Sequence, residues 1–433
     1  MKRNWYSRGI RRTHVHGVLI KKKEEEIMSS DQNTQPEPDV QPDVQQDGAP
    51  DVDAFDALGD DVFDFEMPDI PMPDEEIKEE VVEDKFKSAC KFAFLGIGRA
   101  GSRLVEAFSR IGYARTCVIN TAQQDLAEID MPDSQKLWLG ANGAGGVRKA
   151  GAKFVKDHYE DIVDLMRRSF GSDFERIIIC IGAGGGTGSG GVEVAVEICT
   201  AFAEHMRVTK VGDKTKVGVM VALPTNSERT NMNNAYEAMK FIETKVDEKA
   251  ISPVIVIDNE SVSQLHPGAT LGNVWGKINQ SAVTLLHTFN AICVAPTRHI
   301  ALDPADLETI LEAGLLTYGA TKLKDVSSDG LSKAMTHTIK NNVLCSGFNI
   351  ETATSCGCVI AGEARILDSL NAQDIDQNCF EKIERITAGA AVHRGIYTTK
   401  KDLAAYAMFG GMGIPIERLD EIARLAGKSG WKE

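Results

Sequence analysis

The sequence predicts an α/β protein with a doubly wound domain around a parallel sheet, a long central helix, a smaller α/β domain and an acidic N-terminal tail. Three observations predict this arrangement. Short apolar strands alternate with amphipathic helical segments between residues 91 and 257, glycine-rich turns follow two of those strands, and carboxylates crowd into the stretch before residue 85. Alternating strands and helices are typical of a parallel sheet that is covered on both faces.

The composition suits a globular body. The chain has 433 residues, of which 42% are hydrophobic, enough for two packed domains. Its nine cysteines are odd in number and form no spaced framework, which favours a reducing, cytoplasmic location. Apolar runs stay below the roughly 18 residues that a membrane-spanning helix needs. The basic first 23 residues lack the apolar core of a secretory signal, and Met28 is an alternative start.

One cysteine pair, Cys356 and Cys358, has the spacing of half a metal site. A complete site needs further ligands, and the sequence offers no second pair nearby. The alternation of small residues over residues 354–360 suits a strand better, so we predict no metal-binding residues there.

The charge is concentrated at the N-terminal end. Residues 31–84 hold 20 acids and one base, a net charge of −19, and residues 1–30 hold eight bases and three acids, a net charge of +5. Subtracting both from the total of −15 leaves about −1 for residues 85–433. The body is nearly neutral, and without a basic face we expect no direct nucleic-acid binding.

The acidic stretch is also rich in proline, with seven of the fourteen prolines between Pro36 and Pro73. Such a segment buries too little apolar surface to offset its ordering entropy, so residues 1–85 are expected to form a disordered tail, acidic from residue 31. Apolar side chains near Phe55, Phe63 and Phe65 lie among its carboxylates. They leave two interpretations open, a solvated linker or a short motif that folds onto an adaptor.

Strands and helices of the body can be assigned in order from residue 86. Apolar runs predict strands at residues 91–95, 116–120, 176–181, 217–223 and 253–257. Helical spacing predicts helices around Leu104 to Ile111, at 154–170, at 192–202, and between the last two strands. The wholly apolar run at 176–181 suits the centre of a parallel sheet.

The second half of the chain follows a different pattern. Helices are expected near residues 272–289, 306–316 and 332–341, and strands near 355–360, 385–392 and 404–409. We therefore divide the body into a first domain at 86–271, a central core helix at 272–292, a smaller domain at 293–412, and a terminal helix and end at 413–433.

The strongest indication of function is the loop Gly182-Ala-Gly-Gly-Gly-Thr-Gly-Ser-Gly190, between a buried strand and a helix. Missing side chains let backbone N–H groups approach phosphate oxygens, and the positive end of the following helix points to the same place. Thr187 supplies a hydroxyl for a terminal phosphate. A purely structural role is uncommon for so dense a glycine run in this position.

The first strand also ends in glycines, at Gly96-Ile-Gly-Arg-Ala-Gly101. This is the pattern of dinucleotide-binding domains, which need an acid at the end of the second strand to hold the ribose. Asn120 and Thr121 stand there instead, so an NAD-dependent oxidoreductase is the weaker interpretation. A P-loop ATPase fails because the one Gly-Lys-Ser lies at residues 427–429, with no room for a following helix.

Together these loops resemble the tubulin/FtsZ superfamily of GTPases over about residues 90–412. The run from Gly184 to Gly190 matches the superfamily's signature loop, and residues 96–102, 120–126 and 143–145 are similar to its other phosphate loops. Arg99 and Ala122 depart from the usual residues. The resemblance implies that GTP or GDP, with Mg²⁺, binds through Gly98, Arg99, Ala100, Gly101, Ser102, Asn120, Gly143, Ala144, Gly145, Gly184, Gly185, Gly186, Thr187, Gly188 and Ser189.

Two further segments resemble the superfamily's nucleoside-binding parts. Residues 224–228 are similar to the ribose loop and end on Glu228, although Met232 replaces the usual basic residue, for which Arg229 is the candidate substitute. Residues 257–260 look like tubulin's segment in which an asparagine, here Asn259, reads guanine. Trp275 and Asn279 share a helix face, and the resemblance implies that the first stacks on the base while the second bonds its edge.

The last matching segment is Ala301-Leu-Asp-Pro-Ala-Asp306, which resembles the synergy loop of the superfamily. The resemblance implies that Asp303 and Asp306 are catalytic, because they reach the nucleotide of the neighbouring subunit and position water there. By itself this sequence also reads as a helix N-cap with an acidic first turn. The two roles are compatible.

The resemblance therefore implies a GTPase that forms head-to-tail filaments with itself and hydrolyses GTP on assembly. A non-hydrolysing, GTP-binding scaffold is the alternative, since Ala122 and Ala301 depart from the pattern. Residues 356–360 and 407–411 look closer to FtsZ-like prokaryotic, archaeal or phage members than to eukaryotic tubulin. The chain stops soon after its last helix without the docking peptide of division FtsZ, which argues against a role in cell division. DNA positioning and control of cell shape stay open.

Overall fold

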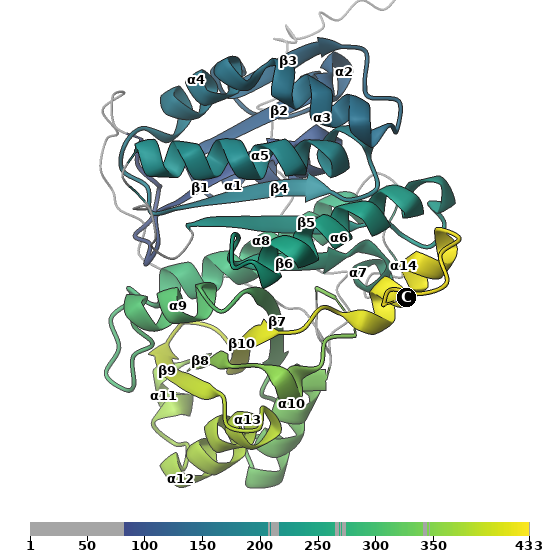
Figure 1. Ribbon diagram of the computed structural model, residues 1–433. Coiled ribbons are helices and arrows are strands. Elements are labelled where there is room, and N and C mark those ends of the chain that lie inside the picture. Colours follow the sequence, from purple (N-terminus) through teal and green to yellow (C-terminus); the bar gives the residue numbers. More distant parts are fainter. Residues whose placement is uncertain are drawn as a thin grey trace, which may run out of the picture. The chain divides into compact units, whose positions relative to one another are not determined.

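The computed structural model describes residues 82–432, apart from 207, 209–215, 265–267, 269, 271–273, 341–343 and 346. The described residues all belong to one compact unit. Their strands form one ten-stranded sheet in the order β3-β2-β1-β4-β5-β6-β7-β10-β8-β9 (Figure 1). The stretch near Phe55, Phe63 and Phe65, interpreted from the sequence as a linker or a docking motif, lies outside the described residues.

The first part of the sheet is parallel and apolar on both faces. Its strands are β1 (Phe92–Ile97), β2 (Thr116–Ala122), β3 (Lys136–Ala141), β4 (Arg176–Gly182), β5 (Val217–Leu223) and β6 (Val254–Asp258). In β1, Phe92 and Phe94 belong to one core, whereas Ala93 and Leu95 belong to the core on the opposite face. Because both faces are buried, the strand reads as a continuous apolar run.

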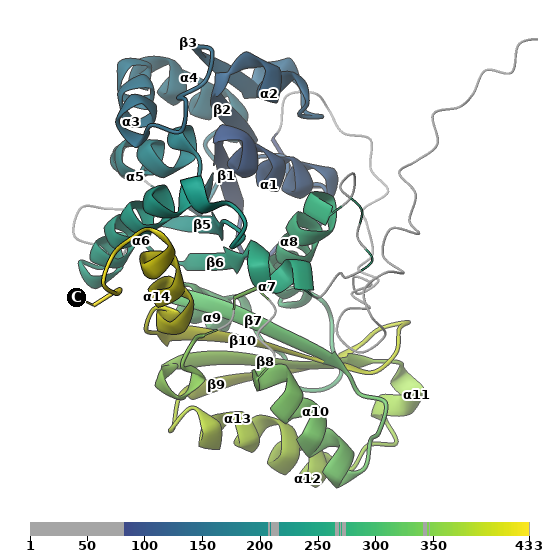
Figure 2. The same cartoon turned by 90° about the vertical axis from the view of Figure 1, so that its right-hand side faces the viewer.

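Helices cover both faces of this parallel part, as Figure 2 shows. One face carries α1 (Gly98–Arg110) and α8 (Val274–Ile292). The other carries α3 (Arg148–Asp157), α4 (Tyr159–Phe170), α5 (Gly186–His205), α6 (Met232–Asp247) and α14 (Ile416–Leu425). Short helices α2 (Gln123–Ala127) and α7 (Asn259–Gln264) directly follow β2 and β6. The doubly wound fold predicted from the sequence is confirmed.

The second part of the sheet is mixed. It consists of β7 (Leu315–Lys322), β10 (Ala404–Met412), β8 (Ser355–Gly362) and β9 (Ala391–Thr398). β10 runs antiparallel to both β7 and β8, whereas β8 and β9 are parallel. A third core lies against these strands under α10 (Ser328–Lys340), α11 (Ala364–Leu367), α12 (Ala372–Ile375) and α13 (Glu381–Ile386). β6 pairs with β7 and so joins the two parts into one continuous sheet. The domain boundaries predicted from the sequence stay predictions.

Several predicted elements need correction. The helix expected at 306–316 is α9 (Pro304–Leu311), and residues from Leu315 onward form β7. The positive φ of Gly314, +99°, is incompatible with continuing the helix. The residues from Leu315 onward form a strand because they pair with β6 and β10. The strand expected at 385–392 is wrong, because α13 runs to Ile386 and a turn through Gly389 precedes β9. The helix expected at 154–170 is two helices, and β3 was not predicted.

The described residues bear on two other expectations. All nine cysteines lie in the described part and are buried free thiols, and Cys356 and Cys358 sit on β8 in the third core. Of the helices in the described ranges, none combines the length and the apolar character required to cross a bilayer.

Candidate functional site

A cavity of about 480 Å³ opens where β1, β2, β4, β5 and β6 end. In a parallel α/β sheet, the loops at the carboxyl ends of the strands are the usual place for a ligand. Of the nineteen residues predicted to bind the nucleotide, fourteen line this cavity: Gly98, Arg99, Ala100, Asn120, Gly143, Ala144, Gly185, Gly186, Thr187, Gly188, Glu228, Asn259, Trp275 and Asn279. The structure therefore brings together loops that are spread over about 180 residues of chain.

Three helices begin beside this cavity without a side-chain cap. Their N-cap residues, Ile97, Val147 and Gly185, make no side-chain capping hydrogen bond, and none of the three helices has an acid in its first turn. The start of α3 lies close to the glycine loop, since a Cβ added to Gly186 would fall 2.7 Å from the Val147 nitrogen. Helix N-termini carry partial positive charge and unpaired N–H donors, so three of them together favour an anion.

The glycines of the loop have two different reasons to be glycine. A Cβ on Gly190 would lie 1.9 Å from the Arg148 carbonyl oxygen, and one on Gly188 would lie 2.9 Å from that of Gly182. These glycines are required by close backbone packing. Gly185 differs, because a Cβ there would meet nothing within 4 Å among the described residues, and its φ of −77° suits any residue. The open space at Gly185 fits a ligand that lies against the backbone.

The hydroxyl predicted to bond a phosphate is held in place. Thr187 lies in the first turn of α5, 8% exposed, with its Oγ1 atom 2.7 Å from Thr121 Oγ1. Five other predicted residues do not line the cavity, namely Gly101, Ser102, Gly145, Gly184 and Ser189. Ser189 is fully buried and its hydroxyl donates to the Gly185 carbonyl, so it stabilises the glycine loop without facing the cavity.

Arg99, the residue that departs from the superfamily's pattern, is paired. Its guanidinium donates to Glu128 Oε2 at 2.9 Å and lies 3.4 Å from Asp125 Oδ1, while Arg103 donates to the same Glu128 oxygen at 3.3 Å. The hydrogen bond from Arg99 lowers the pKa of Glu128, and the same bond raises the pKa of Arg99. Two cations of α1 thus line the cavity, and acids around α2 neutralise them.

The residues predicted to bind the nucleoside lie in the same cavity. The Glu228 carboxylate accepts from the Thr225 N–H at 3.1 Å and from the Asn231 side-chain amide at 2.8 Å, which fixes its orientation. Asn259 is the first residue of α7, and Trp275 and Asn279 lie one turn apart on α8. Trp275 is 37% exposed, so its indole is accessible for stacking, unlike a ring buried in a core.

Asp303 and Asp306 lie elsewhere. They form a capping box at the start of α9, in which Asp303 Oδ1 accepts from the Asp306 N–H at 2.8 Å and Asp306 Oδ2 accepts from the Asp303 N–H at 3.1 Å. On the same helix, Glu308 Oε1 lies 2.7 Å from Arg176, the first residue of β4. α9 is therefore at the amino ends of β4 and β5 (Figure 1). The cavity is at the carboxyl ends of these strands.

A seven-residue strand spans roughly 20 Å. One copy of the chain does not bring the two carboxylates to the cavity. The helix-cap interpretation of Asp303 and Asp306 is confirmed, and their catalytic role stays a prediction.

Eight lining residues are not among the nineteen predicted, although several of them lie in the predicted loops: Ile97, Arg103, Thr121, Ala122, Asp125, Gly182, Ala222 and Asn231. Two of them could have been found. Arg103 lies one turn after Arg99 on α1, and Asn231 lies three residues after Glu228, a spacing that lets the two side chains meet. Ala222, in contrast, carries no chemical signal and lines the cavity only because β5 ends there.

Comparison with known proteins agrees with this geometry. Residues 91–267 match the profile of the tubulin/FtsZ family GTPase domain. The tubulin-like protein CetZ of Thermococcus kodakarensis is 25% identical over 334 residues, covering 73% of this chain and 81% of that protein. Cell division protein FtsZ 2 of Haloferax volcanii is 26% identical over 259 residues, covering 58% of this chain and 59% of that protein.

Solved structures share the fold. A GTPγS-form protofilament of Bacillus thuringiensis serovar israelensis TubZ superposes with a TM-score of 0.66 at 19% identity, covering 79% of this chain and 92% of that chain. A GTPγS-bound protofilament of CetZ2 from Haloferax volcanii gives a TM-score of 0.62 at 20% identity, covering 77% and 98%. These relatives are FtsZ-like proteins of archaea and bacteria rather than eukaryotic tubulins, and residues 91–267 of this chain are similar to the GTPase domain of their family.

Proposed function

We propose that this chain binds GTP in the cavity, assembles head to tail into filaments, and hydrolyses GTP with carboxylates from the neighbouring subunit. One observation carries the proposal. The phosphate-binding loops and the Asp303–Asp306 capping box lie at opposite ends of the same parallel strands, so each is an incomplete half of one site. A second copy stacked along the strand direction completes both.

The phosphates fit the uncapped starts of α1, α3 and α5. Their N–H groups bind the oxygens, Thr187 donates its hydroxyl, and the space beside Gly185 lets the chain approach closely. The base stacks on Trp275 while Asn259 and Asn279 read its edge, and Glu228 holds the ribose. Phosphoryl transfer depends chiefly on such positioning and on charge neutralisation.

The residues present also fit Mg²⁺. Among the described residues no three His, Cys, Asp or Glu side chains are grouped as metal ligands, so the protein forms no cage of its own. Mg²⁺ usually binds substrate phosphates and water with only one or two protein ligands, and Asp125 is the cavity-lining carboxylate beside Arg99. Bound there, the ion neutralises charge on the phosphates.

Assembly follows from the placement of the two half-sites. A contact between the carboxyl-end loops of one copy and the α9 end of the next is heterologous, and without rotational closure it produces an open filament. Asp303 and Asp306 then orient the attacking water, so hydrolysis is slow in the monomer and accelerates on assembly. The GTPγS-form protofilament structures of TubZ and CetZ2 support this arrangement by analogy of fold.

A second candidate is a filament-forming scaffold that binds GTP without turnover. Both Asp306 oxygens already have partners within their own chain, Oδ2 in the capping box and Oδ1 beside His393. A carboxylate held in this way is less free to orient water in a neighbour.

Phosphate release measured across a range of protein concentrations tests the proposal. We expect release per subunit to rise steeply where sedimentation first detects filaments, with Mg²⁺ and GTP driving assembly and GDP not. Filaments without phosphate release would favour the scaffold, and equal pelleting in GTP and GDP would rule out nucleotide-controlled assembly.

The N-terminal tail is part of the proposal. We assign to the stretch near Phe55, Phe63 and Phe65 the docking of an adaptor protein, and to the surrounding net charge of −19 the spacing of neighbouring filaments. Removing residues 1–81 should then preserve GTPase activity and promote filament bundling at low salt. Loss of nucleotide binding would contradict this assignment.

A further inference from the structure

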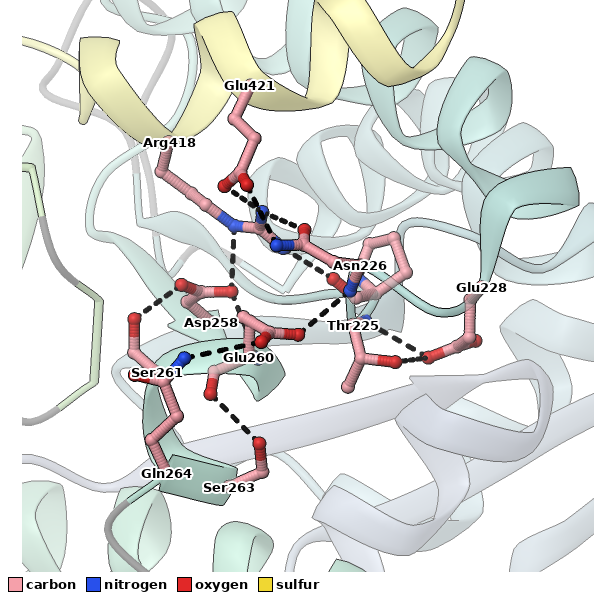
Figure 3. A network of polar contacts seen from close by, with 11 residues as sticks. Thr225, Asn226, Glu228, Asp258, Glu260, Ser261, Ser263, Gln264, Arg418 and Glu421 are labelled. Atoms are coloured by element: carbon pink, nitrogen blue, oxygen red, sulfur yellow. Dashed lines mark hydrogen bonds and ion pairs between the residues drawn. The ribbon is translucent and has the colours of Figure 1, made fainter.

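Arg418 on α14 is a buried cation that donates hydrogen bonds to three groups far from it in the sequence, and to Glu421 of its own helix at 2.7 Å. The residue is 4% exposed. Its Nε donates to Asp258 Oδ1 at 2.9 Å, its Nη2 donates to the Pro224 carbonyl at 2.7 Å, and its Nη1 donates to Asn226 Oδ1 at 2.6 Å. Figure 3 shows the guanidinium lying between Asp258 and Asn226, with α14 above them.

The groups that Arg418 joins belong to two separate segments of the cavity wall. Asn226 lies two residues before Glu228, which lines the cavity. The Glu228 carboxylate accepts hydrogen bonds from the N–H and the hydroxyl of Thr225. Asp258 is the last residue of β6 and precedes Asn259, which also lines the cavity. The two segments also contact each other directly, because the Asn226 N–H donates a hydrogen bond to Glu260 Oε2 at 2.9 Å (Figure 3).

Asp258 depends on this arginine. The carboxylate is 1% exposed, and it also accepts from the Ser261 hydroxyl at 2.5 Å and from the Glu260 N–H at 3.2 Å. Burial raises the pKa of Asp258, and the positive charge of Arg418 opposes that rise. Removing one partner of a buried ion pair leaves the other charge uncompensated, so the end of β6 would rearrange.

The network is not what attaches α14 to the body. Leu419, Ile422 and Ala423 of α14 are fully buried in the core under α6, and the chain after the helix is anchored by Trp431. The Trp431 indole donates to Glu243 at 3.1 Å, and its ring lies 4.3 Å from the Lys240 ammonium. Apolar packing therefore holds α14 in place, and the backbone of Arg418 is fixed independently of the hydrogen bonds that its side chain makes.

We propose that Arg418 is a positioning residue for nucleoside recognition, which holds the segment before Glu228 and the segment before Asn259 in register with each other and with α14. This inference rests on the proposed function of the cavity. A planar guanidinium suits the role, because its rigid fork fixes the directions of several acceptors at once, whereas an ammonium fixes one. By thermodynamic linkage, a nucleoside that binds these segments also stabilises the docked α14.

The first test compares Arg418→Met with Arg424→Met, a matched change on the same helix. Arg424 is exposed and pairs only with Asp420 of its own helix within the described part of the chain. Affinities for GDP and ADP are measured by competition with a fluorescent guanine nucleotide. We expect Arg418→Met to reduce the preference for GDP over ADP at least tenfold, Arg418→Lys to reduce it less, and Arg424→Met to leave it unchanged.

These outcomes separate the possible explanations. A general loss of structure would weaken the binding of GDP and of ADP without changing the ratio of the two affinities. An unchanged affinity ratio in Arg418→Met would overturn the inference and leave the proposed function intact. Failure of the parent chain to bind GDP would overturn the proposed function as well.

A second test uses the parent chain and does not depend on any variant folding. Hydrogen exchange of α14 backbone amides is compared with no ligand, with GDP and with inorganic pyrophosphate, each with Mg²⁺. We expect GDP to slow exchange in residues 416–425 several-fold and pyrophosphate to have no effect there, because the network contacts the nucleoside segments and not the phosphate loops. Equal protection by the two ligands, or none by GDP, would overturn the inference.

Discussion

The Nδ1 atom of His393 lies 2.6 Å from the Oδ1 atom of Asp306, although the two residues are 87 positions apart. His393 belongs to β9, and Asp306 belongs to the first turn of α9. The other Asp306 oxygen accepts from the Asp303 N–H, so the carboxylate is held from two directions. The predicted catalytic acid thus has one defined orientation before any neighbouring subunit arrives.

Replacing Asp306 with alanine should leave GTP binding nearly intact and slow turnover about tenfold or more, at least roughly 1.4 kcal/mol in the barrier. The cavity is at the opposite end of the strands, so binding has no reason to change. Because alanine also removes a cap, Asp306→Asn is the control, since its amide keeps an oxygen for the Asp303 N–H. Phosphate release in assembled protein is the measurement, and a parental rate in both variants would leave Asp306 as a helix cap only.

His393→Leu should slow turnover by a smaller amount, about two- to fivefold, because the Asp306 carboxylate remains and loses only one of its two restraints. GTP affinity and the onset of assembly should stay unchanged. Single-turnover rates in preassembled filaments separate this effect from any change in polymerisation. If His393→Leu matches the parent, the imidazole contributes nothing to the reaction.

Gly185→Ala should weaken nucleotide binding at least about fivefold without loss of stability. The backbone φ and ψ of −77° and 159° suit alanine, and the added methyl group would meet no described atom within 4 Å. Gly-to-Ala changes at compatible positions stabilise proteins by about 0.4–1 kcal/mol. Gly190→Ala is the contrasting variant and should destabilise, because its Cβ would lie 1.9 Å from the Arg148 carbonyl oxygen. Urea unfolding and GDP titration of both variants check the prediction.

The parallel half of the fold could be predicted because its apolar runs and glycine turns are local signals. β5, for example, has the bounds predicted for it, Val217–Leu223. β7 could not be predicted in the same way. Its residues follow a helix closely in sequence, and only pairing with β6 and β10, the latter some ninety positions away, makes them a strand. β3 is mostly half-exposed and carries too little apolar pattern to be noticed.

The site was predictable where chemistry and local pattern coincide, as in the glycine loop that leads to Thr187. Arg418 shows the limit of such reasoning. In the sequence it is one arginine in an amphipathic helix, and a surface position is the ordinary expectation for it. Its 4% exposure and its bonds to Asp258 and Asn226 follow from the packing of α14 against α6, which brings residues 160 to 192 positions apart together.

Asn279→Asp should weaken guanine recognition while sparing the fold. Asn279 lies one turn from Trp275 in the cavity, and a carboxylate cannot offer the donor that an amide offers to the base. The measurement is competition between GTP and other nucleotides before and after the change, with Lys277→Met, on the neighbouring surface of α8, as the control. An unchanged preference would assign guanine reading to Asn259.

Acid should destabilise the protein partly through His287, a 2% exposed residue of α8 whose ring packs against Phe86 and Tyr113. Burial lowers the pKa of His287 from 6.5 to about 4, so the unfolded chain takes up a proton at a pH where the folded chain does not. The stability contribution is therefore complete above pH 6.5 and is lost as the pH falls toward 4, by about 2 kcal/mol at pH 5. In His287→Leu this loss should vanish, although the variant starts from a lower stability at pH 7.5 if leucine packs less well. The free energy of unfolding in urea is measured for both proteins at pH 7.5 and pH 5, and the same decrease in both would assign the acid sensitivity to other groups.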